Sequence, residues 1–416
     1  MDLLIKDAII VDPLSPFHNK KVAIKIINNI ITQISENITD DNIKNISLDN
    51  LHISKGWMDS SVAFGEPGFE ERETIANGLQ VAAKSGFTNI ALQPNTNPVI
   101  DNQTIVSFVK SKALGNACTL NPIGALTKQQ EGNDIAEMFD MKNAGAIAFG
   151  DYKKSINNAN LLKIALQYSQ DFDALILAFC NDATIKGKGV VHEGITSTKL
   201  GLKGIPALAE EVVLARNLFL LEYTGGKMHV PTISTSKSVA LIKDAKAKGL
   251  QVTCSVAVHN LVLTDDVLNE FDTRYKVNPP IRTEDHRQAL INGVLDGTID
   301  CITSDHQPLD IEHKKMEFDM AKDGTIGLES AFGALLNILP LEVVVKKLNA
   351  AKTIFEIENT NIDVNQPACF TLFNPEGNSK FTKESILSKS QNSAFLNVPL
   401  KGEVYGILNN GILNIK

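Results

Sequence analysis

Residues 74–92 read Thr-Ile-Ala-Asn-Gly-Leu-Gln-Val-Ala-Ala-Lys-Ser-Gly-Phe-Thr-Asn-Ile-Ala-Leu. The first part, Thr74 to Lys84, has the apolar spacing of a helix, and the run from Thr88 to Leu92 is short, apolar and strand-like. Gly86 separates the two patterns. The stretch therefore predicts a helix followed by a buried strand.

The same order recurs along the middle of the chain. Regular alternation of helices and strands over about 300 residues predicts a parallel sheet, and we expect an α/β fold with a (β/α)8 barrel. In such barrels the chemistry lies at the C-terminal ends of the strands. The further helix and strand pairs are 134–143 with 146–149, 158–168 with 175–179, 207–222 with 228–230, 236–248 with 251–254, and 285–295 with 300–303.

Both ends of the chain have short strand patterns instead. Two apolar runs, 22–27 and 30–34, flank Asn28-Asn29, and two more, 404–408 and 412–415, flank Asn409-Asn410-Gly411. Such turn residues between apolar runs predict hairpins. Because chain termini often lie close together, we expect residues 1–52 and 365–416 to form one small β-sandwich domain, with the barrel at 53–364.

Composition excludes several classes of protein. The 416 residues are 43% hydrophobic and 21% charged, with a net charge of −8. An acidic chain without a basic block argues against binding to nucleic acid or to an anionic membrane. The five cysteines form no Cys-x-x-Cys pair, so they predict neither a disulfide framework nor a thiolate zinc site. We see no signal peptide and no run of 18 apolar residues, and we expect a cytoplasmic protein.

Polar and glycine-rich segments follow the predicted strands. Together they resemble, in order and over nearly the whole chain, the dihydroorotases of the amidohydrolase superfamily, specifically the longer bacterial type. The resemblance implies a barrel with a small β domain made from both chain ends. The segments are 59–70, 73–75, 86–88, 94–101, 201–206, 209–211, 278–282, 304–308 and 327–329.

Family members interconvert N-carbamoyl-L-aspartate and dihydroorotate. The resemblance implies that a zinc-bound hydroxide attacks the ring amide and that an aspartate after the last strand moves the proton. Such chemistry requires three or more nitrogen or oxygen ligands that converge on one zinc ion.

This sequence differs from the family pattern at the ligands themselves. The four positions that hold ligand histidines in the family are Ser61, Ala63, Phe179 and Thr232 here. Two side chains that contact substrate in the family, an arginine and a histidine, are replaced by Gly65 and Leu309. The remaining ligand positions are the carboxylates Asp151 and Asp305, too few for a tight zinc site. We therefore expect no metal, no cofactor and no catalytic residue, with Asp305 as a remnant.

Other family positions are kept. The resemblance places Asn95, Asn278, Asp323 and Gly324 at the substrate pocket. His229, His259 and His306 are interpreted as structural, through hydrogen bonds of their rings.

Three hypotheses follow. The first is a catalytically silent dihydroorotase homologue, a pseudoenzyme that acts as an assembly partner of aspartate carbamoyltransferase and forms a homodimer, as the family resemblance implies. The second is an active dihydroorotase, or a related cyclic amidohydrolase, with a rebuilt metal site. The third is a metal-free protein that binds a small ureido compound.

Overall fold

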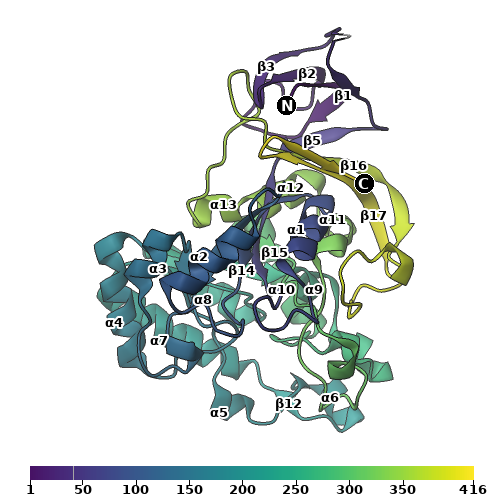
Figure 1. Ribbon diagram of the computed structural model, residues 1–416. Coiled ribbons are helices and arrows are strands. Elements are labelled where there is room, and N and C mark those ends of the chain that lie inside the picture. Colours follow the sequence, from purple (N-terminus) through teal and green to yellow (C-terminus); the bar gives the residue numbers. More distant parts are fainter. Residues whose placement is uncertain (41) are drawn as a thin grey trace.

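The computed structural model describes residues 1–40 and 42–416. Eight parallel strands form a barrel (Figure 1), and β15 returns beside β6, where Val62 bridges to His306 and the Ala63 N–H donates to the His306 carbonyl at 2.9 Å. The predicted α/β barrel is therefore confirmed. In sheet order the strands are β6 (Trp57–Val62), β7 (Phe87–Leu92), β8 (Thr119–Gly124), β9 (Ala148–Phe149), β10 (Leu175–Leu177), β13 (Lys227–Val230), β14 (Val252–Ala257) and β15 (Cys301–Thr303).

Helices follow the strands and cover the barrel. The predicted helix at 74–84 is α1, which begins after Thr74; the Thr74 side chain accepts a hydrogen bond from the Asn77 N–H. One face of α1, including Ile75, Leu79 and Ala82, is buried. The helices are α1 (Ile75–Lys84), α2 (Gln103–Lys112), α3 (Met138–Ala144), α4 (Ala159–Ser169), α5 (Ala183–Lys186), α6 (Ile195–Leu200), α7 (Leu208–Thr224), α8 (Ser236–Ala247), α9 (Val258–Val262), α10 (Glu284–Asp296), α11 (Leu328–Leu336), α12 (Leu341–Asn349) and α13 (Ala351–Ile354).

The two chain ends share a second, mixed sheet at the top of Figure 1, as predicted. Both expected hairpins are present: Asn28 and Asn29 turn between β2 and β3, and Asn410 and Gly411 turn between β17 and β18, all with positive φ. The boundaries 52/53 and 364/365 stay predictions. The strands are β1 (Leu3–Ile10), β2 (Lys21–Ile27), β3 (Ile30–Ser35), β4 (Lys44–Ile46), β5 (His52–Lys55), β16 (Phe370–Lys380), β17 (Pro399–Asn409) and β18 (Ile412–Ile415).

A separate pair, β11 (Val191–His192) and β12 (Gly204–Ile205), lies between α5 and α7 in the sequence. In the part of the chain that the structure describes, no helix has the length and apolar character needed to cross a membrane.

A buried carboxylate ties the first barrel strand to the last. Asp59, fully buried on β6, accepts hydrogen bonds from the Ser61 N–H at 2.9 Å, the Ser304 N–H at 2.8 Å and the Thr303 hydroxyl at 2.5 Å. Burial raises the pKa of Asp59, and the three donors oppose that shift. Asp59 thus connects β6 to the C-terminal end of β15, beside the candidate functional site described below.

We predict that Asp59→Ala lowers the free energy of unfolding by about 2–4 kcal/mol, because two buried backbone N–H groups lose their acceptor. Asp59→Asn keeps one acceptor oxygen, so its free energy of unfolding is expected to fall by less. Urea unfolding measures the free energy of unfolding of both variants. Asp49→Ala, which changes an exposed aspartate, is the matched control. A loss for Asp59→Ala no larger than that of Asp49→Ala would contradict this role.

Candidate functional site at the mouth of the barrel

The C-terminal ends of the barrel strands meet around a small cavity of about 20 Å³. Five of the six metal-ligand positions inferred from the sequence line it. Because side chains leave so little free volume, the floor of the barrel mouth is closely packed. The lining residues are Ser61, Gln93, Gly150, Asp151, Tyr152, Lys153, Leu177, Phe179, Pro231, Thr232 and Asp305.

An ion pair lies at the centre of this floor. The Lys153 ammonium is 2.8 Å from Asp305 Oδ2, and both side chains are largely buried. The other carboxylate oxygen, Oδ1, accepts from the Ser61 hydroxyl at 3.2 Å, and the Tyr152 hydroxyl is 3.5 Å away. Lys153 also donates to Gln307 Oε1 at 3.0 Å. Both oxygens of Asp305 are therefore engaged by groups of the protein.

The phenol of Tyr152 reinforces this arrangement. Burial raises the pKa of Tyr152 well above its ordinary value, and the negative charge of Asp305 adds to the shift. The hydroxyl therefore stays protonated, and its single proton can be donated to Gln307 Oε1 at 3.3 Å or to Asp305 Oδ1 at 3.5 Å.

Asp151, the second remaining carboxylate, serves the backbone. Its Oδ1 accepts from the N–H groups of Leu126 and Thr127, each at 3.0 Å, and its Oδ2 accepts from the Thr127 hydroxyl. Burial raises the pKa of Asp151. Its two oxygens hold the loop after β8 and do not point freely into the mouth.

The four positions that lack the family histidines have different local roles. Phe179 is buried in the floor, and Ala63, also buried, contributes only backbone to barrel closure. Ser61 accepts from Gln93 Nε2 at 3.2 Å. Thr232 has a φ of 50°, a strained conformation for a β-branched residue, and its N–H donates to the Ser255 hydroxyl.

The buried histidines near the mouth are held in the neutral form. Burial lowers the pKa of His229 and of His306 to about 3, and that of His259 to about 4. His229 bonds to the hydroxyls of Thr253 and Ser255, and His306 Nδ1 faces the N–H groups at the start of α11. Within the described chain, neither ring nitrogen of His259 has a hydrogen-bond partner, so the ring hydrogen bonds expected for His259 from the sequence are wrong.

The zinc ion that the family resemblance implies does not fit these residues. Ala63 and Phe179 have no donor atom, and Ser61 and Thr232 offer neutral hydroxyls only. The Asp305 carboxylate is paired with an ammonium group, which a zinc ion would have to displace. Across residues 1–40 and 42–416, no group of three or more His, Cys, Asp or Glu side chains is arranged to hold a metal ion.

A wider cavity of about 440 Å³ opens above the floor. Three of the four predicted substrate-pocket residues, Asn95, Asn278 and Asp323, line it together with Tyr152 and Lys153. The fourth, Gly324, lies beside it with a φ of 147°, and its carbonyl accepts from Asn392 Nδ2 at 3.2 Å. The structure thus brings the predicted pocket residues to one place.

Several side chains that fill the mouth were not predicted from the sequence. Lys153 and Tyr152 follow Asp151 directly, and Gln93 and Gln307 follow β7 and β15. A signal was present, because a lysine two positions after a strand-end carboxylate is a possible ion-pair partner. Its actual partner, Asp305, is 152 positions away, and only the closed barrel brings the two together.

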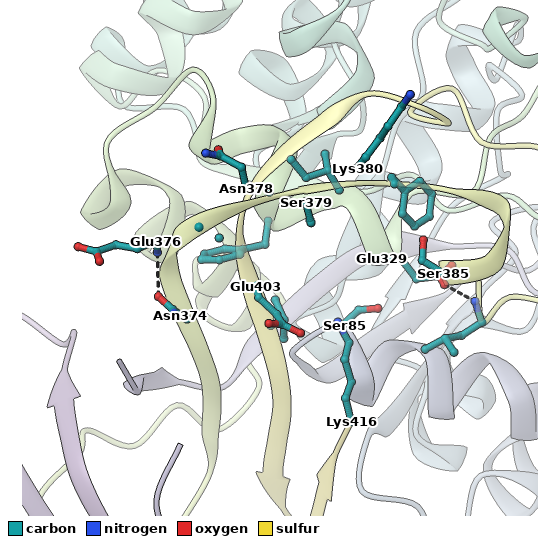
Figure 2. A pocket seen from close by; sticks show the side chains of 18 residues that line it. Ser85, Glu329, Asn374, Glu376, Asn378, Ser379, Lys380, Ser385, Glu403 and Lys416 are labelled. Atoms are coloured by element: carbon teal, nitrogen blue, oxygen red, sulfur yellow. Dashed lines mark hydrogen bonds between the residues drawn. The ribbon is translucent and has the colours of Figure 1, made fainter. Parts of the chain in front are cut away.

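A third cavity of about 400 Å³ lies elsewhere, between α11 and the part of the β16–β17 pair nearest the segment that connects these two strands (Figure 2). Glu329, Glu403 and Lys416 line it. Glu329 accepts from the Ser388 hydroxyl at 2.8 Å and from the Leu387 N–H, and burial raises its pKa. The lining comes from the end of α1, α11 and the terminal sheet, so this cavity is separate from the strand ends.

Comparison with known proteins places the chain in a family. It matches the model of dihydro-orotase-like proteins over residues 52–238. The dihydroorotase of Pelotomaculum thermopropionicum is 40% identical over 410 residues, which cover 97% of this chain and 96% of that protein. This chain belongs to the dihydroorotase family. The dihydroorotase of Caldanaerobacter subterraneus subsp. tengcongensis is 39% identical over 413 residues, covering 97% of this chain and 95% of that protein.

Solved structures agree on the fold of this dihydroorotase-family chain. L-Hydantoinase (dihydropyrimidinase) from Arthrobacter aurescens has a TM-score of 0.85 and covers 99% of this chain and 95% of its own, at 20% identity. D-Hydantoinase from Thermus sp. has a TM-score of 0.82 at 19% identity and covers 100% of this chain and 95% of its own. These structures confirm the predicted fold, the dihydroorotase relatives confirm the predicted family, and the silent site stays a prediction.

We predict that the purified protein, dialysed after incubation with zinc, retains far less than one zinc ion per chain by elemental analysis, because no set of ligands converges. The control is a variant in which Ser61, Ala63, Phe179 and Thr232 are changed to histidine and Lys153 to alanine. This variant is expected to gain zinc. Stoichiometric zinc in the unaltered chain would contradict the prediction.

Proposed function

We propose that this chain is a non-catalytic member of the dihydroorotase family that contributes to pyrimidine synthesis as an assembly partner of aspartate carbamoyltransferase. The observation that supports the non-catalytic part is the Lys153 ammonium, 2.8 Å from Asp305 Oδ2 in the floor of the mouth. The family resemblance assigns proton transfer to this carboxylate. An ammonium group beside it neutralises its charge.

Opening a cyclic amide requires an activated water molecule and a base that receives its proton. Asp305 has both oxygens engaged by Lys153, Ser61 and Tyr152. Asp151 is engaged by the loop after β8. Neither carboxylate is free to orient water above the floor, which supports a silent site.

The proposed assembly role is supported by the chemistry of the pathway and by the family fold, which the chain retains. A dihydroorotase acts on N-carbamoyl-L-aspartate, the product of aspartate carbamoyltransferase, so the two proteins meet the same metabolite. A relative matches over 97% of the chain, while Ser61, Ala63, Phe179 and Thr232 stand where the family resemblance implies ligand histidines. A fold that is kept around a changed site fits a role carried by the protein's surface.

The second candidate is an active dihydroorotase with a rebuilt site. The comparisons support it more than they support the first, because the matched relatives are named dihydroorotases and align over nearly their full length. The candidate requires water activation by Asp151, Asp305 or His259. The contacts of Asp151 and Asp305 in the floor support the first candidate instead, and His259 is not among the described residues that line the floor.

The test of activity is dihydroorotate hydrolysis by the pure chain with added zinc. Its background control is an active dihydroorotase whose ligand histidines are replaced by the residues found here. We expect a rate equal to that background, and no change in Asp305→Ala. A rate clearly above background that falls in Asp305→Ala would refute the non-catalytic role and establish the second candidate.

The test of assembly is size-exclusion chromatography with light scattering on a mixture with aspartate carbamoyltransferase from the same source. We expect a complex that changes the transferase rate, and the same complex with Asp305→Ala, because the barrel floor is not a binding surface. Separate elution at micromolar concentrations would refute the assembly role.

A further inference from the structure

A polar cavity of about 300 Å³ lies at the other end of the barrel, where the strands begin. Asn89 and Thr119, near the starts of β7 and β8, line it from the barrel. Asn409, the last residue of β17, lines it from the terminal sheet, and Lys352 on α13 forms part of its wall. The cavity therefore lies between the barrel and the terminal sheet, away from the mouth.

The side chain of Lys352 brings a positive charge to this wall. Lys352 is 1% exposed. Among the described residues, its ammonium group has one hydrogen-bond partner, the Cys369 sulfur at 3.6 Å, and pairs with no carboxylate. Sulfur is a weak acceptor, and a buried ammonium group without a counter-charge is strongly unfavourable.

The groups nearby do not supply the missing negative charge. Glu358, the single acidic residue of the lining within the described chain, is exposed. Burial raises the pKa of Cys118, although the charge of Lys352 lowers it, so this thiol stays neutral. Lys55, the second cation of the lining, has its own carboxylate partner, Asp12 Oδ1 at 3.7 Å. The charge of Lys352 is therefore left for a ligand.

The same wall has a free amide donor. Asn89 is 7% exposed, and its Oδ1 accepts from the Thr88 hydroxyl at 3.1 Å, whereas its Nδ2 donates to no group in the described chain. The Nδ2 atoms of Asn409 and Asn410 are engaged, since they donate to the Ala117 carbonyl at 2.8 and 3.4 Å. Asn89 thus has N–H groups for an acceptor that enters the cavity.

We infer that this cavity binds a phosphate group, with Lys352 supplying the charge and Asn89 Nδ2 an N–H donor. Lysine binds phosphate as a point charge, and N–H groups donate strong hydrogen bonds to its oxygens. A volume of about 300 Å³ has room for free phosphate or for the phosphate ester of a small molecule. The inference does not rest on the proposed function, because this cavity shares no lining residue with the mouth.

The test is isothermal titration calorimetry with inorganic phosphate at constant ionic strength. We expect saturable binding at one site per chain. Lys352→Met is expected to weaken it by about tenfold or more, and Asn89→Ala by about tenfold, because each removes a donor to a charged group. The matched control is Lys347→Met, which removes another buried ammonium group, one that donates to the Ile299 carbonyl and does not line this cavity. It is expected to leave binding unchanged.

Methyl phosphate, titrated in the same way, distinguishes the two sources of the phosphate group: tighter binding than phosphate indicates an ester, and weaker binding indicates free phosphate. Absence of binding at millimolar concentrations would overturn the inference, as would unchanged binding by Lys352→Met when circular dichroism shows that it is folded. Alkylation of Cys369 by iodoacetamide in mildly acidic buffer, where an ordinary thiol is protonated, together with no phosphate binding, would assign the counter-charge to a thiolate instead.

Discussion

The arrangement of the mouth depends on one buried ion pair. Asp305 is 1% exposed at the end of β15, and a buried carboxylate without a partner is strongly unfavourable. In the family pattern a metal ion supplies the compensating charge; here the Lys153 ammonium supplies it from the segment after β9. The pair also organises Tyr152, Gln307 and Ser61 into one network that fills the space over the strand ends.

Sequence similarity and site geometry measure different properties of this chain. Identity of 40% over 410 residues is an average over nearly the whole chain. The reaction depends on six ligand positions, and changing four of them alters overall identity by very little. Full-length similarity therefore establishes the family, and the side chains at the strand ends bear on activity. Overall identity favours an active dihydroorotase, and the geometry of the site favours a non-catalytic homologue. The two differ because identity averages over the whole chain, whereas the site depends on a few side chains.

Much of the fold could be predicted because local patterns carry it. The helix at 75–84, the strand at 87–92 and the hairpin around Asn28 and Asn29 each follow from spacing or turn chemistry. The strand β8 at 119–124 was not predicted, because Asn121 and Pro122 interrupt its apolar pattern; in the structure β8 pairs with a parallel strand on each side. The site positions followed from family motifs, whereas the Lys153–Asp305 pair did not, because tertiary closure alone brings the two together.

The most direct test of the central claim is a crystal structure of the zinc-soaked protein with diffraction recorded on the absorption edge of zinc. The account predicts no anomalous peak in the mouth and the Lys153 ammonium against Asp305. A strong zinc peak between Asp151 and Asp305, with Lys153 displaced, would contradict it.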